Sequence, residues 1–297
     1  MTDLEELKID VLVIGAGPAG SLAATMLQKQ GVSVRVVEKQ KFPRFSIGES
    51  LLPQLMCFLK DADMLETVNS ANYQFKNGAA FQKGGQYSAF NFEEKFTDGP
   101  GTTFQVKRAE FDHRLALRAE ELGVVIDYQH EVISVDIGEQ SNRVSVKKED
   151  GESYIIEAGF ILDASGFGRV LPRLLDLELP SEMPVRKSLF CHIKDNITQK
   201  DYDRNKILIS VHPEDNSVWY WLIPFSDGTC SLGVVAKAEF FDSMEGNDQN
   251  KLMQCISAEP SLSALLARSE IVSEVQNIGG YSANVKSLFG KNYALLG

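Results

Sequence analysis

A glycine-rich segment near the start of the chain has the residue types and the spacing that bind phosphate groups. Gly15, Gly17 and Gly20 follow the pattern Gly-x-Gly-x-x-Gly, and Pro18 and Ala19 stand between the last two glycines. Gly15 permits a tight turn, Gly17 lets backbone amides approach a pyrophosphate, and Gly20 allows a helix to pack closely on a sheet. The segment therefore predicts a dinucleotide site, and the alternative is a glycine-rich turn without a ligand.

The second candidate site contains both tryptophans of the chain. Trp219 and Trp221 flank Tyr220 in a short apolar segment that ends at Pro224, which is typical of a β-strand. Because side chains alternate along a strand, we expect both indoles on one face and Tyr220 on the other. Two indoles on one face can form a rigid apolar wall, and they can equally belong to an ordinary sheet core.

Several alternating segments must position these residues. The βαβ pattern around the glycines places Glu38 at the end of the second strand, where a carboxylate can accept hydrogen bonds from a ribose diol. Asp150-Gly151 predicts a hairpin turn between two later strands. The predicted strands are 9–14, 32–37, 124–128, 131–137, 143–148, 153–158, 160–162 and 219–224, and the predicted helices are 21–30, 51–59, 108–122 and 251–258.

The order of these segments resembles the glutathione-reductase-type FAD-binding fold, in which a βαβ unit is followed by a helix, a strand and a three-stranded antiparallel crossover. The aromatic-hydroxylase branch of that fold has a second motif, Asp-Gly followed by Ser and Arg. Asp163, Ser165 and Arg169 match it, with Ala164 in place of the glycine. The resemblance implies an α/β protein with a parallel FAD-binding sheet, the antiparallel crossover and an inserted, mostly antiparallel substrate domain.

The same resemblance implies roles for residues around the dinucleotide. Glu38 would bind the adenosine ribose, and Arg44 and Arg108 would lie near the pyrophosphate and the ribityl chain. The backbone of Val132 would contact adenine, and Asp163 would help to hold the dinucleotide. The alternatives are a solvated surface charge for each arginine and a strand-end cap for Asp163. The expected FAD-binding residues are Gly15, Gly17, Pro18, Ala19, Gly20, Glu38, Arg44, Gly48, Glu49, Ser50, Arg108, Val132 and Asp163.

Three further strings resemble the flavin-dependent halogenases, in particular their phenol- and pyrrole-type members. Trp219–Pro224 matches the signature W-x-W-x-I-P, and Phe42–Pro53 is similar to the corresponding stretch of that branch. Phe75–Phe81 resembles the segment that carries the catalytic lysine of the family, which corresponds to Lys76. The resemblance extends over almost the whole chain and implies catalytic roles for this lysine and for both tryptophans.

The chemistry implied by this resemblance is halogenation of an electron-rich aromatic substrate, either a free small molecule or a carrier-bound one. A separate flavin reductase would supply reduced FAD, dioxygen would form a flavin hydroperoxide, and a halide ion would be oxidised to hypohalous acid. A lysine would receive this oxidant, either as a haloamine or through a hydrogen bond, and deliver the halogen, while the tryptophan wall keeps the substrate away from the flavin. The alternatives are a flavin monooxygenase, a prenyl-chain reductase and a non-catalytic FAD-binding relative of the same fold.

The surroundings of Lys76 in the sequence fit such a role, because apolar residues flank it at Phe75 and Ala79–Phe81. If the side chain is buried, desolvation lowers the pKa of its ammonium group and leaves part of it as a neutral, nucleophilic amine. The alternative is an exposed amine at the start of a strand. Lys83 and Lys107 are nearby lysines that could be mistaken for it.

The domain boundaries follow from the expected fold. We expect an FAD-binding domain at residues 1–66, 104–180 and 275–297 and a substrate domain at residues 67–103 and 181–274. In this superfamily the strand at the end of the chain leads into further segments that bind the flavin and cup the halide. We therefore expect the chain to be a truncated form whose full activity needs those segments.

Composition disfavours several other classes of protein. The 297 residues contain 30 Lys and Arg against 41 Asp and Glu, and the formal net charge of −11 disfavours nucleic acid and anionic membranes as partners. No apolar run reaches the roughly 18 residues of a membrane span, and the acidic start is unlike a secretory signal. The four cysteines and four histidines show no metal-ligand spacing. We expect a cytoplasmic protein without a metal site.

Overall fold

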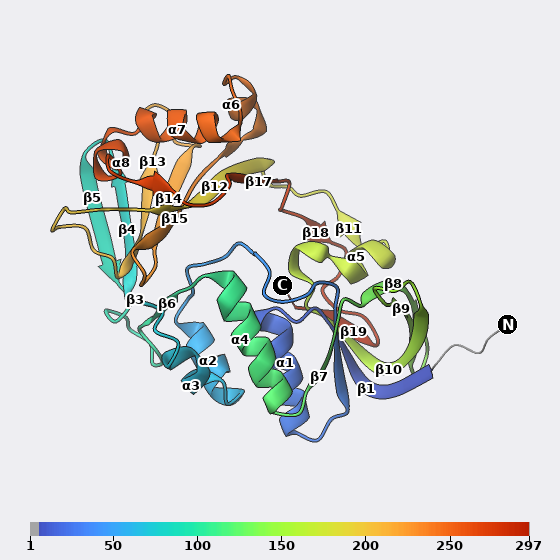
Figure 1. Ribbon diagram of the computed structural model, residues 1–297. Helices are drawn as coiled ribbons and strands as arrows, with labels where there is room; N and C mark the ends of the chain where they lie inside the picture. Colours follow the sequence, from blue (N-terminus) through green and yellow to red (C-terminus); the bar gives the residue numbers. More distant parts are fainter. Residues whose placement is uncertain (1–5, 297) are drawn as a thin grey trace.

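Two β-sheets organise the computed structural model, which describes residues 6–296 (Figure 1). In the seven-stranded sheet, β7, β2, β1 and β10 run parallel to one another, and β9 and β8 continue the sheet in antiparallel fashion. Its strands are β1 Glu6–Ile14, β2 Val34–Glu38, β7 Val125–Tyr128, β8 Glu131–Ile137, β9 Asn142–Lys147, β10 Ser153–Asp163 and β19 Tyr293–Leu295, which pairs with β10.

The central parallel strands end at the same edge of this sheet. Ile14 lies opposite Val37 of β2 on one side and opposite Asp163 of β10 on the other. Just beyond the strand ends, the amide of Gly15 donates to the Val37 carbonyl and the amide of Ala164 donates to the Ile14 carbonyl, both at 2.8 Å. The loops that follow β1, β2 and β10 are therefore neighbours, as the predicted βαβ pattern requires.

Strand β10 differs from the prediction of two separate strands at 153–158 and 160–162. It is continuous, pairing antiparallel with β9 over its first half and parallel with β1 along its length. Because β1 offers an unbroken partner from Glu6 to Ile14, the chain passes through Gly159 without leaving the sheet. The antiparallel crossover β8-β9-β10 is therefore fused with the parallel sheet.

Two helices on the side of the seven-stranded sheet begin at residues other than those predicted. Helix α1 Pro18–Lys29 starts before the predicted Ser21, because proline suits the first helical position, where an N–H would have no helical partner. Helix α2 Gln54–Asp61 starts after the predicted Leu51, whose amide donates to the Phe104 carbonyl (3.1 Å) in an extended segment. The others are α3 Leu65–Asn69, α4 Arg108–Glu121, a 3-10 turn at Gly166–Gly168 and α5 Val170–Leu174. Within residues 6–296, no helix is both long and apolar enough to cross a membrane.

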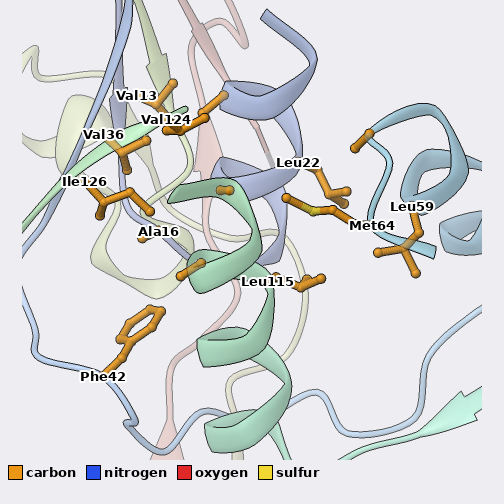
Figure 2. Packing of buried hydrophobic residues seen from close by; sticks show 14 of the residues in the cluster. Val13, Ala16, Leu22, Val36, Phe42, Leu59, Met64, Leu115, Val124 and Ile126 are labelled. Carbon is orange, nitrogen blue, oxygen red and sulfur yellow. The ribbon is translucent and has the colours of Figure 1, made fainter. Parts of the chain in front are cut away.

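Helices α1 and α4 share a buried core with one face of the seven-stranded sheet. Figure 2 shows Val13, Val36 and Ile126 on the strand side of this core, with Leu22 and Leu115 contributed by the helices. Burial of an aliphatic side chain of this size contributes roughly 1.5–3 kcal/mol. The core therefore holds the first turn of α1 firmly against the edge where the strands end.

The eight-stranded sheet is largely antiparallel, with β4 and β13 paired in parallel. In Figure 1 its helices, α6 Ala238–Asp242, α7 Asp248–Ala258 and α8 Pro260–Leu265, cover the face directed away from the first sheet. Strand β17 lies within the predicted FAD-binding segment 275–297 and pairs with β12 of this sheet. The strands are β4 Gly78–Lys83, β5 Gln86–Asn91, β12 Arg186–Lys194, β13 Lys206–Val211, β14 Trp219–Pro224, β15 Thr229–Lys237, β16 Glu270–Ile271 and β17 Gln276–Gly279.

Short strand pairs connect the two halves. β3 Gln74–Lys76 pairs with β6 Thr103–Gln105, and β11 Glu178–Leu179 pairs with β18 Asn284–Val285. The loop segment Glu49–Leu51 runs along the other edge of β6, where Ser50 bridges to Gln105. This small ribbon places the long loop after β2 between the two sheets.

Candidate functional site

The glycine turn has the close contacts that require glycine. Gly15 has φ +97°, and a Cβ atom there would lie 2.7 Å from the Ala164 carbonyl oxygen. A Cβ atom at Gly20 would lie 1.9 Å from the Gly15 carbonyl oxygen. The first turn of α1 contains Pro18 and Ala19. It can lie this close to the turn after β1 only because Gly15 and Gly20 both lack a side chain.

Gly17 caps helix α1 at the same turn, and it leaves room for a ligand. Within residues 6–296, no side chain caps this helix by accepting from its first amides. A Cβ atom at Gly17 would have the Arg44 Nη2 atom as its nearest neighbour, at 3.5 Å. Free amides at a helix N-terminus together with a guanidinium group form a suitable binding site for phosphate groups.

Glu38 ends β2 beside this turn, and its side chain is only 5% exposed. Its Oε2 atom accepts from the Ala16 amide and its Oε1 atom accepts from the Gln40 amide, both at 2.8 Å. Each oxygen keeps acceptor capacity for a ribose hydroxyl. The Glu38 carbonyl accepts from the His130 amide (3.0 Å), which brings the start of β8, with the buried side chain of Val132, to the same edge.

Asp163 lies at the end of β10 and is 4% exposed. Its Oδ1 atom accepts from the Ser165 amide (2.9 Å) and its Oδ2 atom accepts from the Leu171 amide (2.7 Å). These contacts are those of a strand-end cap, the alternative that the sequence left open. The carboxylate therefore shapes the loop that packs against the glycine turn.

Arg44 and Arg108 share one buried carboxylate, that of Asp112. Arg108 binds it through Nε (2.7 Å) and Nη2 (3.0 Å), and Arg44 binds it through Nη1 (3.0 Å). Arg108 also donates to the Ile47 carbonyl (2.6 Å), and its Nη1 atom occupies the space that a Cβ at Gly48 would need. Sequence reasoning missed Asp112, although its i,i+4 spacing from Arg108 on a predicted helix was visible.

The two indoles lie on one face of β14, as alternation predicts. The rings of Trp219 and Trp221 are 6.2 Å apart between centroids, whereas Tyr220 points to the opposite face and donates to the Cys255 carbonyl (2.9 Å). The Trp221 Nε1–H donates to the Ser231 hydroxyl at 3.0 Å. This hydrogen bond and the surrounding apolar cluster, which includes Ile47, hold the Trp221 ring in one position.

Lys76 meets the condition for a perturbed amine. It is 2% exposed, its Nζ atom donates to the Leu51 carbonyl (2.7 Å), and this atom lies 5.2 Å from the centre of the Phe92 ring. Burial lowers the pKa of the Lys76 ammonium group from its ordinary value of 10.5 to about 8. Roughly a tenth of the amine is therefore neutral at pH 7.

The two other candidate lysines lie in different surroundings. Lys83 is exposed and donates to the Asn216 side chain. Lys107 is partly exposed and forms an ion pair with Asp227 at 2.6 Å. Of the three lysines, Lys76 is the buried one, so burial distinguishes them where the sequence pattern left them open.

Glu49 and His192 form a pair that sequence reasoning did not find. The Glu49 Oε1 atom lies 2.7 Å from the His192 Nε2 atom, and the two side chains are 1% and 21% exposed. The residues are 143 positions apart and belong to the loop after β2 and to β12, so no local pattern indicates the contact. The pair ties this loop to the eight-stranded sheet.

The loop from Phe42 to Pro53 lies against three parts of the candidate site. Arg44 lies beside the glycine turn, Ile47 packs in the cluster that contains both indoles, and the Leu51 carbonyl accepts from Lys76. One loop between the sheets thus links the glycine turn, the cluster that contains both indoles, and Lys76.

Comparison with known proteins agrees with this arrangement. The protein family described as FAD binding domain matches residues 8–275. A solved flavoprotein/dehydrogenase from Cytophaga hutchinsonii is 40% identical, with a TM-score of 0.92, over 97% of this chain and 70% of that one. The solved myxobacterial chondrochloren halogenase CndH, described as a variant of FAD-dependent halogenases, is 28% identical with a TM-score of 0.88, over 98% of this chain and 68% of that one.

Curated relatives include several halogenases. The 1H-pyrrole-2-carbonyl-(peptidyl-carrier protein) chlorinase of Pseudomonas fluorescens is 28% identical, and the match covers 97% of this chain and 69% of the relative. The chain spans between 55% and 70% of the length of eight of the curated relatives that it matches.

Proposed function

The chain belongs to the FAD-binding domain family, and from that membership we propose that it is the flavin-binding and lysine-bearing part of a flavin-dependent halogenase. The reaction would place a halogen on an electron-rich aromatic substrate, with a halide ion as co-substrate. A separate flavin reductase would supply the reduced cofactor. The observation that carries the proposal is the buried amine of Lys76 on the loop that also borders the dinucleotide site and the two indoles.

The residues at the edge of the seven-stranded sheet fit the adenosine and pyrophosphate part of FAD. The free amides at the start of α1 and the Arg44 guanidinium would hold the phosphates, and the Glu38 carboxylate would hold the ribose. When bound, reduced FAD supplies the activation of dioxygen that turns the halide into hypohalous acid. The protein must then carry that small oxidant to the substrate.

Lys76 would receive the halogen from hypohalous acid. The neutral amine donates its lone pair to the halogen, an N–halogen bond forms, and the O–halogen bond breaks. The departing hydroxide takes a proton from the nitrogen and becomes water. The pKa of about 8, caused by burial, favours this step because it keeps a fraction of the amine neutral near pH 7.

The aromatic substrate would be kept on the far side of the Trp219 and Trp221 rings. The rigid position of the Trp221 indole, bound to Ser231 and packed against Ile47, supports this separation. Relatives whose names describe halogenation of a pyrrole group on a peptidyl-carrier protein support a carrier-bound or free aromatic substrate.

The test is to supply the full-length protein that contains this chain with FAD, a flavin reductase, dioxygen and either chloride or bromide, and to offer phenols, pyrroles and indoles. We expect halogenated product from wild type. A Lys76→Met variant should lose at least about tenfold in product while it still consumes dioxygen, and the matched control Lys83→Met should behave as wild type. The proposal is wrong if wild type yields only hydroxylated or unchanged aromatics and no hypohalous acid is trapped.

A second candidate is a flavin-dependent dehydrogenase, reductase or monooxygenase of the same fold. The name of the flavoprotein/dehydrogenase that shares 40% identity supports it. In that case the Lys76→Met variant would retain turnover, because no halogen transfer to an amine is required. The same experiment therefore separates the two candidates.

A further inference from the structure

Three short extended segments form a ribbon around Lys76. In the antiparallel pair β3–β6, Lys76 lies opposite Thr103 and Gln74 lies opposite Gln105. On the other edge of β6, Ser50 bridges to Gln105, with supporting backbone bonds on either side at 3.1 Å and 2.8 Å. Residues opposite each other in an antiparallel pair share a face. The five side chains therefore lie on the same face of the ribbon.

This face is deeply buried. Thr103 and Gln105 are each 1% exposed, and Lys76 is 2% exposed. The bond from Lys76 Nζ to the Leu51 carbonyl reaches the third segment of the ribbon, so the lysine side chain crosses β6 on this face. The amine is thus held at the Leu51 carbonyl, on the same face of the ribbon as Ser50 and Gln105, rather than in solvent.

Two oxygen atoms on this face have no hydrogen-bond partner within the described part of the chain, namely Gln105 Oε1 and Ser50 Oγ. The Gln105 amide is oriented by its Nε2 group, which donates to the Arg204 carbonyl at 3.1 Å. A buried polar atom without a partner is destabilising and is rare in folded proteins. Two such atoms on the same face as a buried amine offer hydrogen-bonding groups to a small polar molecule.

The available groups define the chemistry of that molecule. Gln105 Oε1 can only accept a hydrogen bond, whereas Ser50 Oγ can donate and accept, and Lys76 has N–H groups or a lone pair to offer. A bare halide ion fits poorly, because it would face the carbonyl oxygens of Gln105 and Leu51. The match is a small neutral hydroxyl compound that donates to Gln105 and accepts from Ser50 or Lys76.

We propose that this face, formed by Ser50, Gln105 and Lys76, holds hypohalous acid immediately before halogen transfer, an inference that rests on the proposed function. Gln105 accepts the O–H group and Ser50 donates to the oxygen, which directs the halogen toward the lysine nitrogen. The nitrogen lone pair then forms the N–halogen bond while the O–halogen bond breaks. The oxygen leaves as hydroxide and gains the amine proton, so that water is the second product.

The first test uses methanol on the flavin-free protein, because its methyl group has the size of a chlorine atom and its hydroxyl group has the same hydrogen-bonding capacity. The readout is the NMR signal of the Lys76 side chain, assigned by its loss in Lys76→Met. We expect a saturable shift with methanol and none with bromide at equal ionic strength. Gln105→Leu and Ser50→Ala should reduce this shift at least about fivefold.

The matched control is Gln74→Leu, which removes the same side chain from the same face at a position whose amide already donates to Phe75 and Asn205. It should leave the methanol response unchanged. The inference is overturned if bromide rather than methanol shifts the Lys76 signal, or if both Gln105→Leu and Ser50→Ala respond as wild type does. Ser50→Ala, a small change, keeps the test decisive where Gln105→Leu impairs folding.

The second test measures where the oxidant goes in the reconstituted reaction. In Gln105→Leu, we expect at least a roughly tenfold rise in the ratio of hypohalous acid caught by a scavenger to halogenated product. A wild-type ratio in this variant overturns the inference and leaves the proposed function standing. The absence of hypohalous acid in wild type and in every variant overturns both.

Discussion

The Trp221 indole lies directly against Gly233 on the neighbouring strand β15. The two residues are opposite each other in the β14–β15 pair, and a Cβ atom at Gly233 would lie 2.2 Å from Cζ2 of the indole. The ring thus occupies space that any other residue at position 233 would fill. Glycine at position 233 therefore allows the Trp221 ring to lie close to the backbone of β15.

The first prediction concerns Gly233→Ala. The added methyl group must displace the Trp221 ring, and overpacking of this kind costs about 1–3 kcal/mol. Urea unfolding should show this loss, and the tryptophan fluorescence should change. The control is Gly279→Ala on β17, where the nearest atom to a new Cβ is 3.8 Å away. Equal stability of the two variants would contradict the packing described above.

The second prediction concerns the pH dependence of stability. Folded Lys76 releases its proton near its pKa of about 8, whereas an unfolded lysine holds its proton to about 10.5. Between these values the unfolded state binds more protons at this site, so the contribution of Lys76 to the free energy of unfolding rises with pH, by up to roughly 3 kcal/mol across the window. Lys76→Met lacks this contribution, so the free energy of unfolding of wild type should increase with pH relative to that of Lys76→Met.

The measurement for this prediction is urea unfolding of wild type and Lys76→Met at a series of pH values across the window. Lys83→Met, at an exposed position, is the control and should follow wild type. A constant difference between wild type and Lys76→Met at every pH would show that the Lys76 ammonium group is not desolvated.

The third prediction concerns the pair formed by buried Glu49 and partly exposed His192. His192→Leu leaves the Glu49 carboxylate buried without its partner, which should cost about 3 kcal/mol. Glu49→Gln in the same chain removes the charge and should recover part of that loss. A double-mutant cycle by urea unfolding measures the coupling. Strict additivity of the two changes would refute the interaction.

The fourth prediction separates two glycines of the phosphate turn. Gly17→Ala should fold with a loss of at most about 1 kcal/mol, because the nearest atom to its new Cβ is the Arg44 side chain at 3.5 Å. It should weaken FAD binding at least about tenfold, because the methyl group enters the space proposed for the pyrophosphate. Gly20→Ala should instead destabilise the fold, since its Cβ would lie 1.9 Å from the Gly15 carbonyl.

Titration of FAD followed by flavin fluorescence, together with urea unfolding, checks both glycine variants. If Gly17→Ala bound FAD as tightly as wild type does, the phosphates would have to lie elsewhere. Wild-type stability in Gly20→Ala would mean that α1 can move away from the turn after β1.

Local patterns predicted the parts of the structure that depend on neighbours in the chain. The period of two along Trp219–Pro224 was sufficient to put both indoles on one face, and the βαβ pattern located the glycine turn and Glu38. The strand at 153–163 was divided in the prediction because its continuity depends on β1, a distant partner. Sequence patterns describe a strand poorly when its pairing is set by a remote segment.

Side-chain contacts between distant segments could not be predicted in the same way. Glu49 meets His192 across 143 positions, and Gln105 of β6 meets Ser50 of the loop after β2 through a single β-bridge. The burial of Lys76 was stated only as a condition, because it depends on Leu51 and Phe92 closing around the amine. These contacts became visible only once the fold had brought the segments together.

The loop from Phe42 to Pro53 also limits how this architecture can be recombined. Since it borders the glycine turn through Arg44, the indole cluster through Ile47 and the ribbon through Leu51, it belongs to neither half alone. A chimaera that joins the first half of one homologue to the second half of another would have to transfer this loop, and its partner His192, as a unit. Protein engineers who exchange whole domains should therefore place the crossover outside this loop.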